Sequence, residues 1–150
     1  KIRLNHGFMI LICYNNENNH EGVNMLEIYL DAASAGNPGK SGIGVFIKGE
    51  GHNLHISEFI GESDNHSAEF KALIRGLEEA KRLGSQLISV RSDSNIVVSS
   101  MEKRYVKKDE FKPLLDEALL LADSFDLFFI KLIPSNENKA ADSLARRALH

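Results

Sequence analysis

The hydrophobic residues change their spacing partway along the chain, and this change restricts the fold to a mixed α/β class. Between residues 26 and 60, apolar and polar residues alternate, as in Leu26, Ile28 and Leu30. Such alternation predicts half-buried β-strands. From Ser67 onward, segments with apolar residues at helical spacing alternate with short apolar runs. The chain should therefore contain a group of strands followed by alternating helices and strands.

The first part of the chain predicts three strands with short connections, over residues 26–31, 42–48 and 53–60. The first connection contains Gly36-Asn37-Pro38-Gly39, a strong turn signal, and the second contains Gly49-Glu50-Gly51. Short connections of this kind join antiparallel neighbours. We therefore expect an antiparallel meander.

The second part of the chain predicts four helices and two further strands. The first helix, over residues 67–83, places Glu69, Leu73, Leu77 and Ala80 on one face, and Gly84 is suited to end it. A strand over residues 87–92 and helices over 94–102 and 109–122 should follow. Residues 125–133 are almost unbroken apolar, which predicts a strand buried on both faces. The last helix is expected over residues 138–149, with Ser135 as a possible cap.

The element order is therefore βββ-α-β-α-α-β-α. The two later strands follow crossover helices, so they should lie parallel to the first strand. The expected fold is a mixed five-stranded sheet, with three antiparallel strands and then two parallel ones, and with helices on both faces. Residues 25–150 form this domain, and residues 1–24 are either an extension from an upstream start or an added edge strand.

Composition excludes several classes of protein. The chain of 150 residues has a formal net charge of −3, which excludes a broadly cationic nucleic-acid coat but leaves room for a local basic patch. The single Cys13 excludes an intramolecular disulfide framework and a Cys-rich zinc site. The longest apolar run, residues 8–14, is shorter than the roughly 20 residues that span a bilayer. We expect a cytoplasmic, reduced protein with no membrane partner, and no protein partner is implied.

Four carboxylates occupy the ends of predicted elements. Asp31 closes the first strand, Asp93 closes the fourth, Glu69 opens the first long helix, and Asp142 lies in the first turns of the last helix. In open α/β sheets, ligands bind beyond the carboxyl ends of the parallel strands. The first and fourth strands should be neighbours, so the predicted topology brings these four acids toward one edge of the sheet.

Each carboxylate also has a purely structural interpretation. Asp31 could be a turn residue, Asp93 could cap the helix that begins at Ser94, and Glu69 could favour a helix N-terminus. Asp142 could pair with Arg146 four residues later, a contact worth only about 0.2–0.5 kcal/mol. The convergence of all four favours a functional site over these separate roles.

Four clustered carboxylates would repel one another and raise their pKa values. A divalent cation removes that cost, and an all-oxygen ligand set favours Mg²⁺ or Mn²⁺ over zinc. Two such ions about 3.5–4 Å apart can activate a water and stabilise the leaving oxygen of a phosphodiester. The acids alone therefore indicate metal-dependent phosphoryl transfer.

Four short motifs, in the same order and on the predicted elements, resemble those of the type 1 ribonuclease H family. They are DAASAGNPG at residues 31–39, NHSAE at 65–69, SDSN at 92–95 and NKAADSLAR at 138–146. The family's patterns are Asp-Gly-Ser-x-x-Gly-Asn-Pro-Gly, Asn-Asn-x-x-Glu, Thr-Asp-Ser-Gln and Asn-x-x-x-Asp-x-Leu-Ala-Arg. The resemblance covers residues 26–149, and it implies the ribonuclease H-like fold.

The resemblance implies an endoribonuclease that cleaves the RNA strand of RNA–DNA hybrids and leaves 5′-phosphate and 3′-hydroxyl ends. It implies that two Mg²⁺ ions, or Mn²⁺ in their place, are held by Asp31, Glu69, Asp93 and Asp142. It also implies that three amide side chains contact the hybrid, namely those of Asn37, Asn65 and Asn95. Short amides can bind the 2′-hydroxyls that line an RNA minor groove.

The sequence departs from the family's pattern at several positions. Many members carry a His in the loop before the last helix, whereas residues 134–137 contain none, as in a His-lacking bacterial and archaeal subgroup. This departure concerns turnover more than metal binding. His66 replaces the second Asn, Ala32 and Ala33 replace Gly-Ser, and Asn95 is one methylene shorter than Gln.

The basic connector over residues 103–108 lies where some relatives have a protrusion that grips the substrate. Lys103, Arg104 and Lys107 would there bind DNA-strand phosphates and make binding sensitive to salt. A solvated charged loop is an equal alternative.

Two rival functions remain open at the level of sequence. The first is a binding module with weak or absent catalysis, which is motivated by the missing loop His and by His66. The second is a nuclease of the same superfold that acts on DNA or on Holliday junctions, because fold does not fix substrate.

Overall fold

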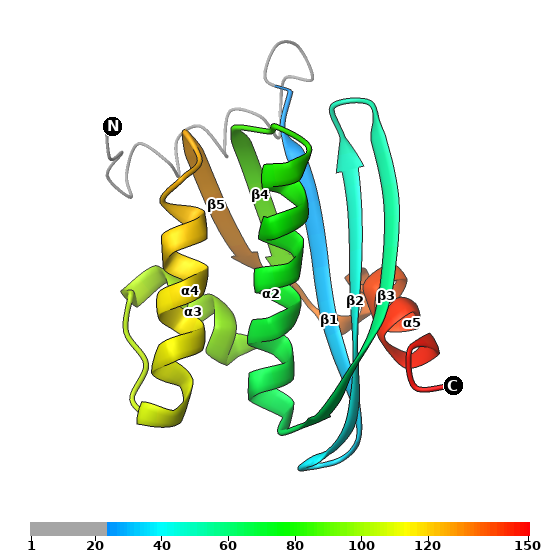
Figure 1. Ribbon diagram of the computed structural model, residues 1–150. Coiled ribbons are helices and arrows are strands. Elements are labelled where there is room, and N and C mark those ends of the chain that lie inside the picture. The colour runs from blue at the N-terminus through cyan, green and yellow to red at the C-terminus, as the bar shows by residue number, and fades with distance from the viewer. Residues whose placement is uncertain (1–23) are drawn as a thin grey trace.

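Residues 24–150 are described by a computed structural model in which five strands form one mixed sheet in the order β3-β2-β1-β4-β5 (Figure 1). The strands are β1 (Leu26–Gly36), β2 (Gly39–Gly49), β3 (His52–Ser63), β4 (Leu87–Ser92) and β5 (Leu127–Leu132). The helices are α2 (Asn65–Arg82), α3 (Asn95–Lys103), α4 (Lys112–Ala122) and α5 (Lys139–Arg147), with 3-10 turns at Asp109–Phe111 and Ser135–Glu137. The predicted order of elements and the predicted class of sheet are confirmed.

The described part of the chain begins just before β1. The predicted extension or added strand falls on residues 1–24, of which 1–23 lie outside the described residues. No helix within residues 24–150 is long and apolar enough to cross a membrane.

The pairing of β1 differs on its two sides. Against β4 it is parallel and ends at the pair Leu30–Ser92. Against β2 it is antiparallel and continues to the pair Gly36–Gly39. The prediction that Asp31 closes the first strand is therefore wrong, because the hairpin with β2 prolongs β1 by five residues beyond it. Asp31 is instead the first residue of β1 past the parallel pairing.

The main core lies between the sheet and the helices α2 and α4, which cover one face together (Figure 1). The alternation predicted for β1 is confirmed, since Leu26, Ile28 and Leu30 are buried. The predicted inner face of α2 is also buried at Leu73 and Leu77. Helix α2 ends as the sequence indicates. Gly84 has φ +77°, and the N–H groups of residues 84 and 85 bond the carbonyls of residues 81 and 80.

Two sequence predictions near the C-terminus are wrong. The apolar run of residues 125–133 is not buried on both faces, because β5 is an edge strand with Lys131 and Leu132 exposed. The apolar run extends beyond the strand at both ends, and its flanking residues Phe125 and Ile133 are buried. Ser135 does not cap the last helix, since it lies in a 3-10 turn and α5 begins only at Lys139.

Helix α5 covers the opposite face of the sheet and packs unusually close to β2 (Figure 1). A Cβ atom at Gly44 would meet the Ala141 carbonyl oxygen and would lie 2.5 Å from the Ala145 nitrogen. At Gly42 it would lie 2.6 Å from the Ala145 carbonyl oxygen. The helix backbone therefore rests directly on the strand, and the two glycines leave the space for it.

Gly44→Ala should lower the free energy of unfolding by about 1–3 kcal/mol, because the new methyl group meets helix backbone that cannot rotate away. Gly76→Ala is the matched control. The nearest atoms to its Cβ are side-chain methyl groups of Leu30, Ile28 and Val45, at 2.9, 3.0 and 3.5 Å, and alanine favours the helix. Urea unfolding of the two variants tests this, and a loss for Gly44→Ala no larger than that for Gly76→Ala would contradict it.

Candidate metal centre

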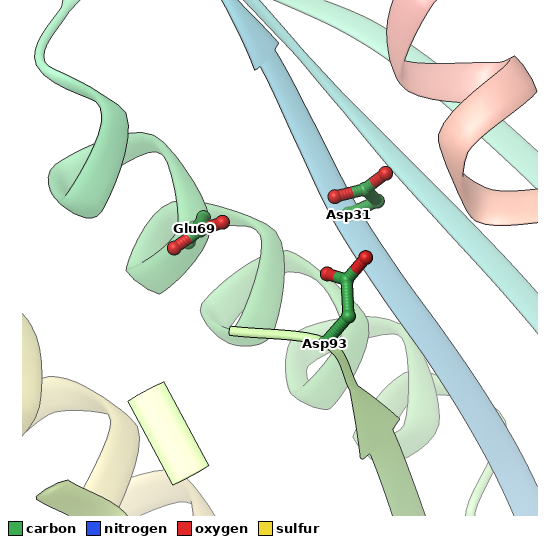
Figure 2. Close-up of side chains that lie close together, drawn as sticks. All are labelled: Asp31, Glu69 and Asp93. Atoms are coloured by element: carbon green, nitrogen blue, oxygen red, sulfur yellow. The ribbon is translucent and has the colours of Figure 1, made fainter. Parts of the chain in front are cut away.

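Three of the four predicted carboxylates meet where β1 passes the end of β4 (Figure 2). Asp31 comes from β1, Glu69 from α2, and Asp93 from the residue after β4. One carboxylate oxygen of each lies within 4.8 Å of the others, and all three side chains are half-buried. Such a group of oxygens is of a size to surround one cation.

The sheet and one helix cap fix these positions. Asp31 and Asp93 each follow the last parallel pair, Leu30–Ser92, so the strand register makes them neighbours. Glu69 lies in the first turns of α2, which is set by its N-cap. The side chain of Asp64 accepts a hydrogen bond of 2.9 Å from the Ser67 N–H.

Asp142 approaches the same site from α5. It is not a member of the three-residue group found among residues 24–150, but it lies near enough to Asp31 to raise its pKa by a side-chain hydrogen bond and by charge repulsion. It also accepts a hydrogen bond of 3.0 Å from Arg146 Nε, as the structural alternative for this residue predicted. The structural alternative for Asp142 is therefore confirmed, and its role as a fourth metal ligand stays a prediction.

The electrostatics of the centre reflect crowding of like charges. Burial, and then repulsion from Asp93, raise the pKa of Asp31 to about 8, although the Ala32 N–H donates a bond of 2.9 Å to its carboxylate and opposes the rise. Burial likewise raises the pKa of Glu69, and contacts with Ser94 and His66 partly offset it. The rise in pKa that the sequence predicted for clustered acids is present at Asp31 and Glu69, with burial as its largest cause.

Ser94 is a residue whose role at the site the sequence reasoning missed. Its Oγ donates a hydrogen bond to Glu69 Oε2, and it is also the N-cap of α3. The alternative that Asp93 caps this helix is therefore wrong, and the Asp93 carboxylate remains available to the centre. Its position in the sequence, between Asp93 and the start of a predicted helix, could have indicated that Ser94 lies at the site.

The three predicted amides lie around the centre on separate elements. Asn37, in the β1–β2 turn, accepts a hydrogen bond of 3.0 Å from the Asn65 N–H, so the hairpin is tied to the start of α2. Both residues are exposed, and so is Asn95 at the start of α3. All three amides therefore remain accessible from solvent.

The basic connector divides into two parts. Lys103 and Lys107 line a surface pocket together with His66 and Asn95. His66 also lies 3.8 Å from Glu69, so this pocket adjoins the carboxylate group. Arg104 has a different environment, because it forms two hydrogen bonds of 3.0 and 2.7 Å to Asp123.

The donor set fits a hard divalent cation. Asp31, Glu69 and Asp93 offer only carboxylate oxygens, which are the ligands that Mg²⁺ and Mn²⁺ prefer. A cation among them would also remove the repulsion that raises the pKa of Asp31. These three residues could hold one ion, and Asp142 lies beside Asp31 where it could contact a second.

Comparisons with known proteins agree with this site and fold. A family model described as "Reverse transcriptase-like" matches residues 30–148. "Putative hydrolase EbsB" of Enterococcus faecalis is 42% identical over 127 residues, which are 83% of this chain and 94% of that protein. Ribonuclease HI of Halobacterium salinarum is 35% identical over 124 residues, which are 81% of this chain and 62% of that protein.

Solved structures show the same fold. The crystal structure of the Halobacterium salinarum enzyme has a TM-score of 0.78 at 33% identity, over 83% of this chain and 97% of that one. The complex of LC11-RNase H1 with an RNA/DNA hybrid has a TM-score of 0.75 at 35% identity, over 82% and 95% of the two chains. The fold and its acidic cluster thus define a ribonuclease H-like domain. The chain belongs to the "Reverse transcriptase-like" family and is homologous to the type 1 ribonucleases H.

Asp31→Asn should stabilise the metal-free protein at high pH. The folded protein keeps a proton that the unfolded chain releases near pH 3.8, so the free energy of unfolding should fall as the pH rises from 3.8 to about 8. The slope for one proton is at most about 1.4 kcal/mol per pH unit. The variant should therefore exceed the wild type most at pH 8 and least at pH 4 in thermal unfolding.

The exposed Asp126 provides the control, since Asp126→Asn should leave the pH profile of stability unchanged. Parallel profiles for the wild type and Asp31→Asn would contradict the prediction.

Proposed function

We propose that this protein is a metal-dependent endoribonuclease that hydrolyses the RNA strand of RNA–DNA hybrids. The observation that carries the proposal is the group of three carboxylates within 4.8 Å at the end of β4, on the fold of the ribonucleases H. A relative of 35% identity, LC11-RNase H1, was crystallised with an RNA/DNA hybrid, which supports the choice of substrate.

In the proposed mechanism, Mg²⁺ or Mn²⁺ would be held by the clustered carboxylates, and the chemistry that it would supply is activation of a water and stabilisation of the leaving 3′-oxygen, with 5′-phosphate and 3′-hydroxyl products. The protein's own residues hold and orient the centre. Asp31, Glu69 and Asp93 supply oxygen ligands, and the Ser94 hydroxyl keeps the Glu69 carboxylate turned toward the group. Asp142 adds a fourth carboxylate beside Asp31.

The hybrid would be held by the residues around the centre. Asn37 and Asn65 are already linked to each other, which orders this part of the surface before substrate binds. Their exposed amides, and that of Asn95, can bind 2′-hydroxyls in the minor groove of the hybrid. Lys103 and Lys107, which line the pocket beside the centre, would attract phosphates of the DNA strand.

Asp93→Asn should abolish cleavage while the fold is retained, because it removes a ligand oxygen and a negative charge from the centre. The measurement is gel analysis of a 5′-labelled RNA–DNA hybrid with Mg²⁺, Mn²⁺ or EDTA. Matched double-stranded RNA, double-stranded DNA and a Holliday junction serve as the specificity panel. Glu117→Gln, on α4, is the control for loss of one exposed acid.

Cutting of the hybrid alone, dependent on metal and lost in Asp93→Asn, would support the proposal. Full activity in Asp93→Asn would exclude the proposed centre. Cutting of DNA or of the junction would show that the substrate is not the RNA–DNA hybrid alone. Tight hybrid binding without cleavage in either metal would favour the alternative function, a catalytically inactive binding module. That alternative is motivated by the missing loop His and by His66, which replaces the second Asn of the family's pattern.

Replacing Lys103 and Lys107 together by Ala should weaken binding of the hybrid and flatten its salt dependence. Each lost phosphate contact should lower the slope of log K against log salt concentration by about one. Fluorescence anisotropy of a labelled hybrid in EDTA measures this.

Two controls separate specific from general effects in that experiment. Lys81→Ala, in the last turn of α2, should leave the slope unchanged. Arg104→Ala should change the slope less than the double variant, because Arg104 is already paired with Asp123. An unchanged slope in the double variant would mean that the connector is only a solvated loop.

A further inference from the structure

A buried amide stands at the junction between β5 and α5. The side chain of Asn138 is 1% exposed, and its Nδ2 donates a hydrogen bond of 2.7 Å to the Leu30 carbonyl oxygen. Its Oδ1 is buried and has no hydrogen-bond partner among the described residues. Burying an amide that is only half satisfied costs free energy, so this side chain needs an explanation beyond packing.

The partner of Asn138 is next to the candidate centre. Leu30 directly precedes Asp31 in β1 and forms the last parallel pair with β4. On its other side, the Asn138 carbonyl oxygen accepts a hydrogen bond of 3.1 Å from the Asp142 N–H. The Asn138 side chain is thus bonded to the residue before Asp31, and its backbone carbonyl accepts the regular helix bond of Asp142.

Asn138 makes this contact in place of a local one. It is the N-cap residue of α5, yet its side chain makes no capping hydrogen bond. Asp64 and Ser94, at the starts of α2 and α3, both cap with their side chains. Asparagine is a favourable N-cap. The Asn138 side chain therefore gives up the stabilisation of a capping hydrogen bond and bonds the sheet instead.

Besides Asn138, α5 contacts the sheet through packing and through one further side-chain hydrogen bond. Gly42 and Gly44 let the helix backbone approach β2 closely, and Ala141, Leu144 and Ala145 of the helix are buried. At the far end, the Ser57 Oγ donates a hydrogen bond of 2.7 Å to the Leu144 carbonyl oxygen. Asn138 supplies the corresponding polar tie at the end that carries Asp142.

We propose that Asn138 is a positioning residue that holds the start of α5 against β1 and so sets the Asp142 carboxylate beside Asp31. Asn138 itself touches neither substrate nor metal and acts through Asp142. The inference rests on the proposed function for its catalytic consequence. Its structural content, the placement of Asp142 by Asn138, stands independently of that function.

The kinetic test uses Asn138→Leu, which keeps the size of the side chain and removes the donor. Its kcat on the hybrid should fall at least about 10-fold, as losses of outer-shell partners do, while KM changes less than about 2-fold. In an Asp142→Asn background the same substitution should cost less than about 2-fold, because the residue through which Asn138 acts is already disabled. Ser57→Ala is the matched control, because it removes the other polar tie of α5, and its kcat should stay within about 2-fold of the wild type.

A merely structural role would give a different result. Asn138→Leu would then lower kcat by the same factor in the Asp142→Asn background as in the wild type. Alternatively, Ser57→Ala would lower kcat as much as Asn138→Leu does, at a similar loss of melting temperature. Either result would overturn the proposal. If Asn138→Leu does not fold, Asn138→Ser replaces it, since serine keeps a polar group but is too short to reach Leu30.

A crystal structure of the same variant separates this inference from the proposed function. The Asp142 carboxylate should move away from Asp31 in Asn138→Leu and should keep its place in Ser57→Ala. An unmoved Asp142 would refute the positioning role even in an active enzyme. A wild type without nuclease activity would refute the proposed function, and the displacement would still decide whether Asn138 places Asp142.

Discussion

The parallel pairing of β1 with β4 ends at Leu30 and Ser92, and the candidate centre depends on that end point. The next residue on each strand is a site aspartate, so two carboxyl groups are held side by side by the hydrogen-bond ladder of the sheet. Because β1 continues in its hairpin with β2, Asp31 is fixed within a regular strand and not in a turn. The helices then add their acids to a pair that the sheet has already placed.

Burial in the fold disfavours the charged form of these clustered acids. Burial and repulsion raise the pKa of Asp31 and of Glu69, so the metal-free protein holds its site acids in an unfavourable state near neutral pH. Such local instability is typical of sites that await a cation or a substrate. The surrounding contacts stabilise the unfavourable cluster. Ser94 bonds Glu69, and Ala32 bonds Asp31.

The two faces of the sheet contribute in different ways. On one face, α2 and α4 bury the apolar core, and α2 carries Glu69 at its first turns. On the other face, α5 rests on Gly42 and Gly44 and carries Asp142. The three clustered carboxylates therefore lie at one strand end, and α5 brings Asp142 beside Asp31 from the opposite face of the sheet.

Much of this could be predicted from the sequence, because the relevant signals are local. Alternation in residues 26–30, the helical spacing of Leu73 and Leu77, and the glycine at residue 84 reflect rules that act within a few residues. The order of these elements, with crossover helices before the later strands, was enough to place Asp31, Glu69 and Asp93 at one edge. The errors arose where distant contacts decide. An apolar run could not show that β5 is an edge strand, and Asp31 gave no sign that β1 continues past it.

The sequence by itself determined the class of fold, the order of strands and helices, and the identity of the clustered acids, because periodicity and short motifs are properties of neighbouring residues. Only the tertiary structure decided which polar groups pair with one another. It assigned the Ser94 hydroxyl to Glu69, Arg104 to Asp123, and the Asn138 amide to Leu30 across 108 residues of chain. Those pairings depend on the packing of elements that are remote in sequence, and no local pattern encodes their distance or direction.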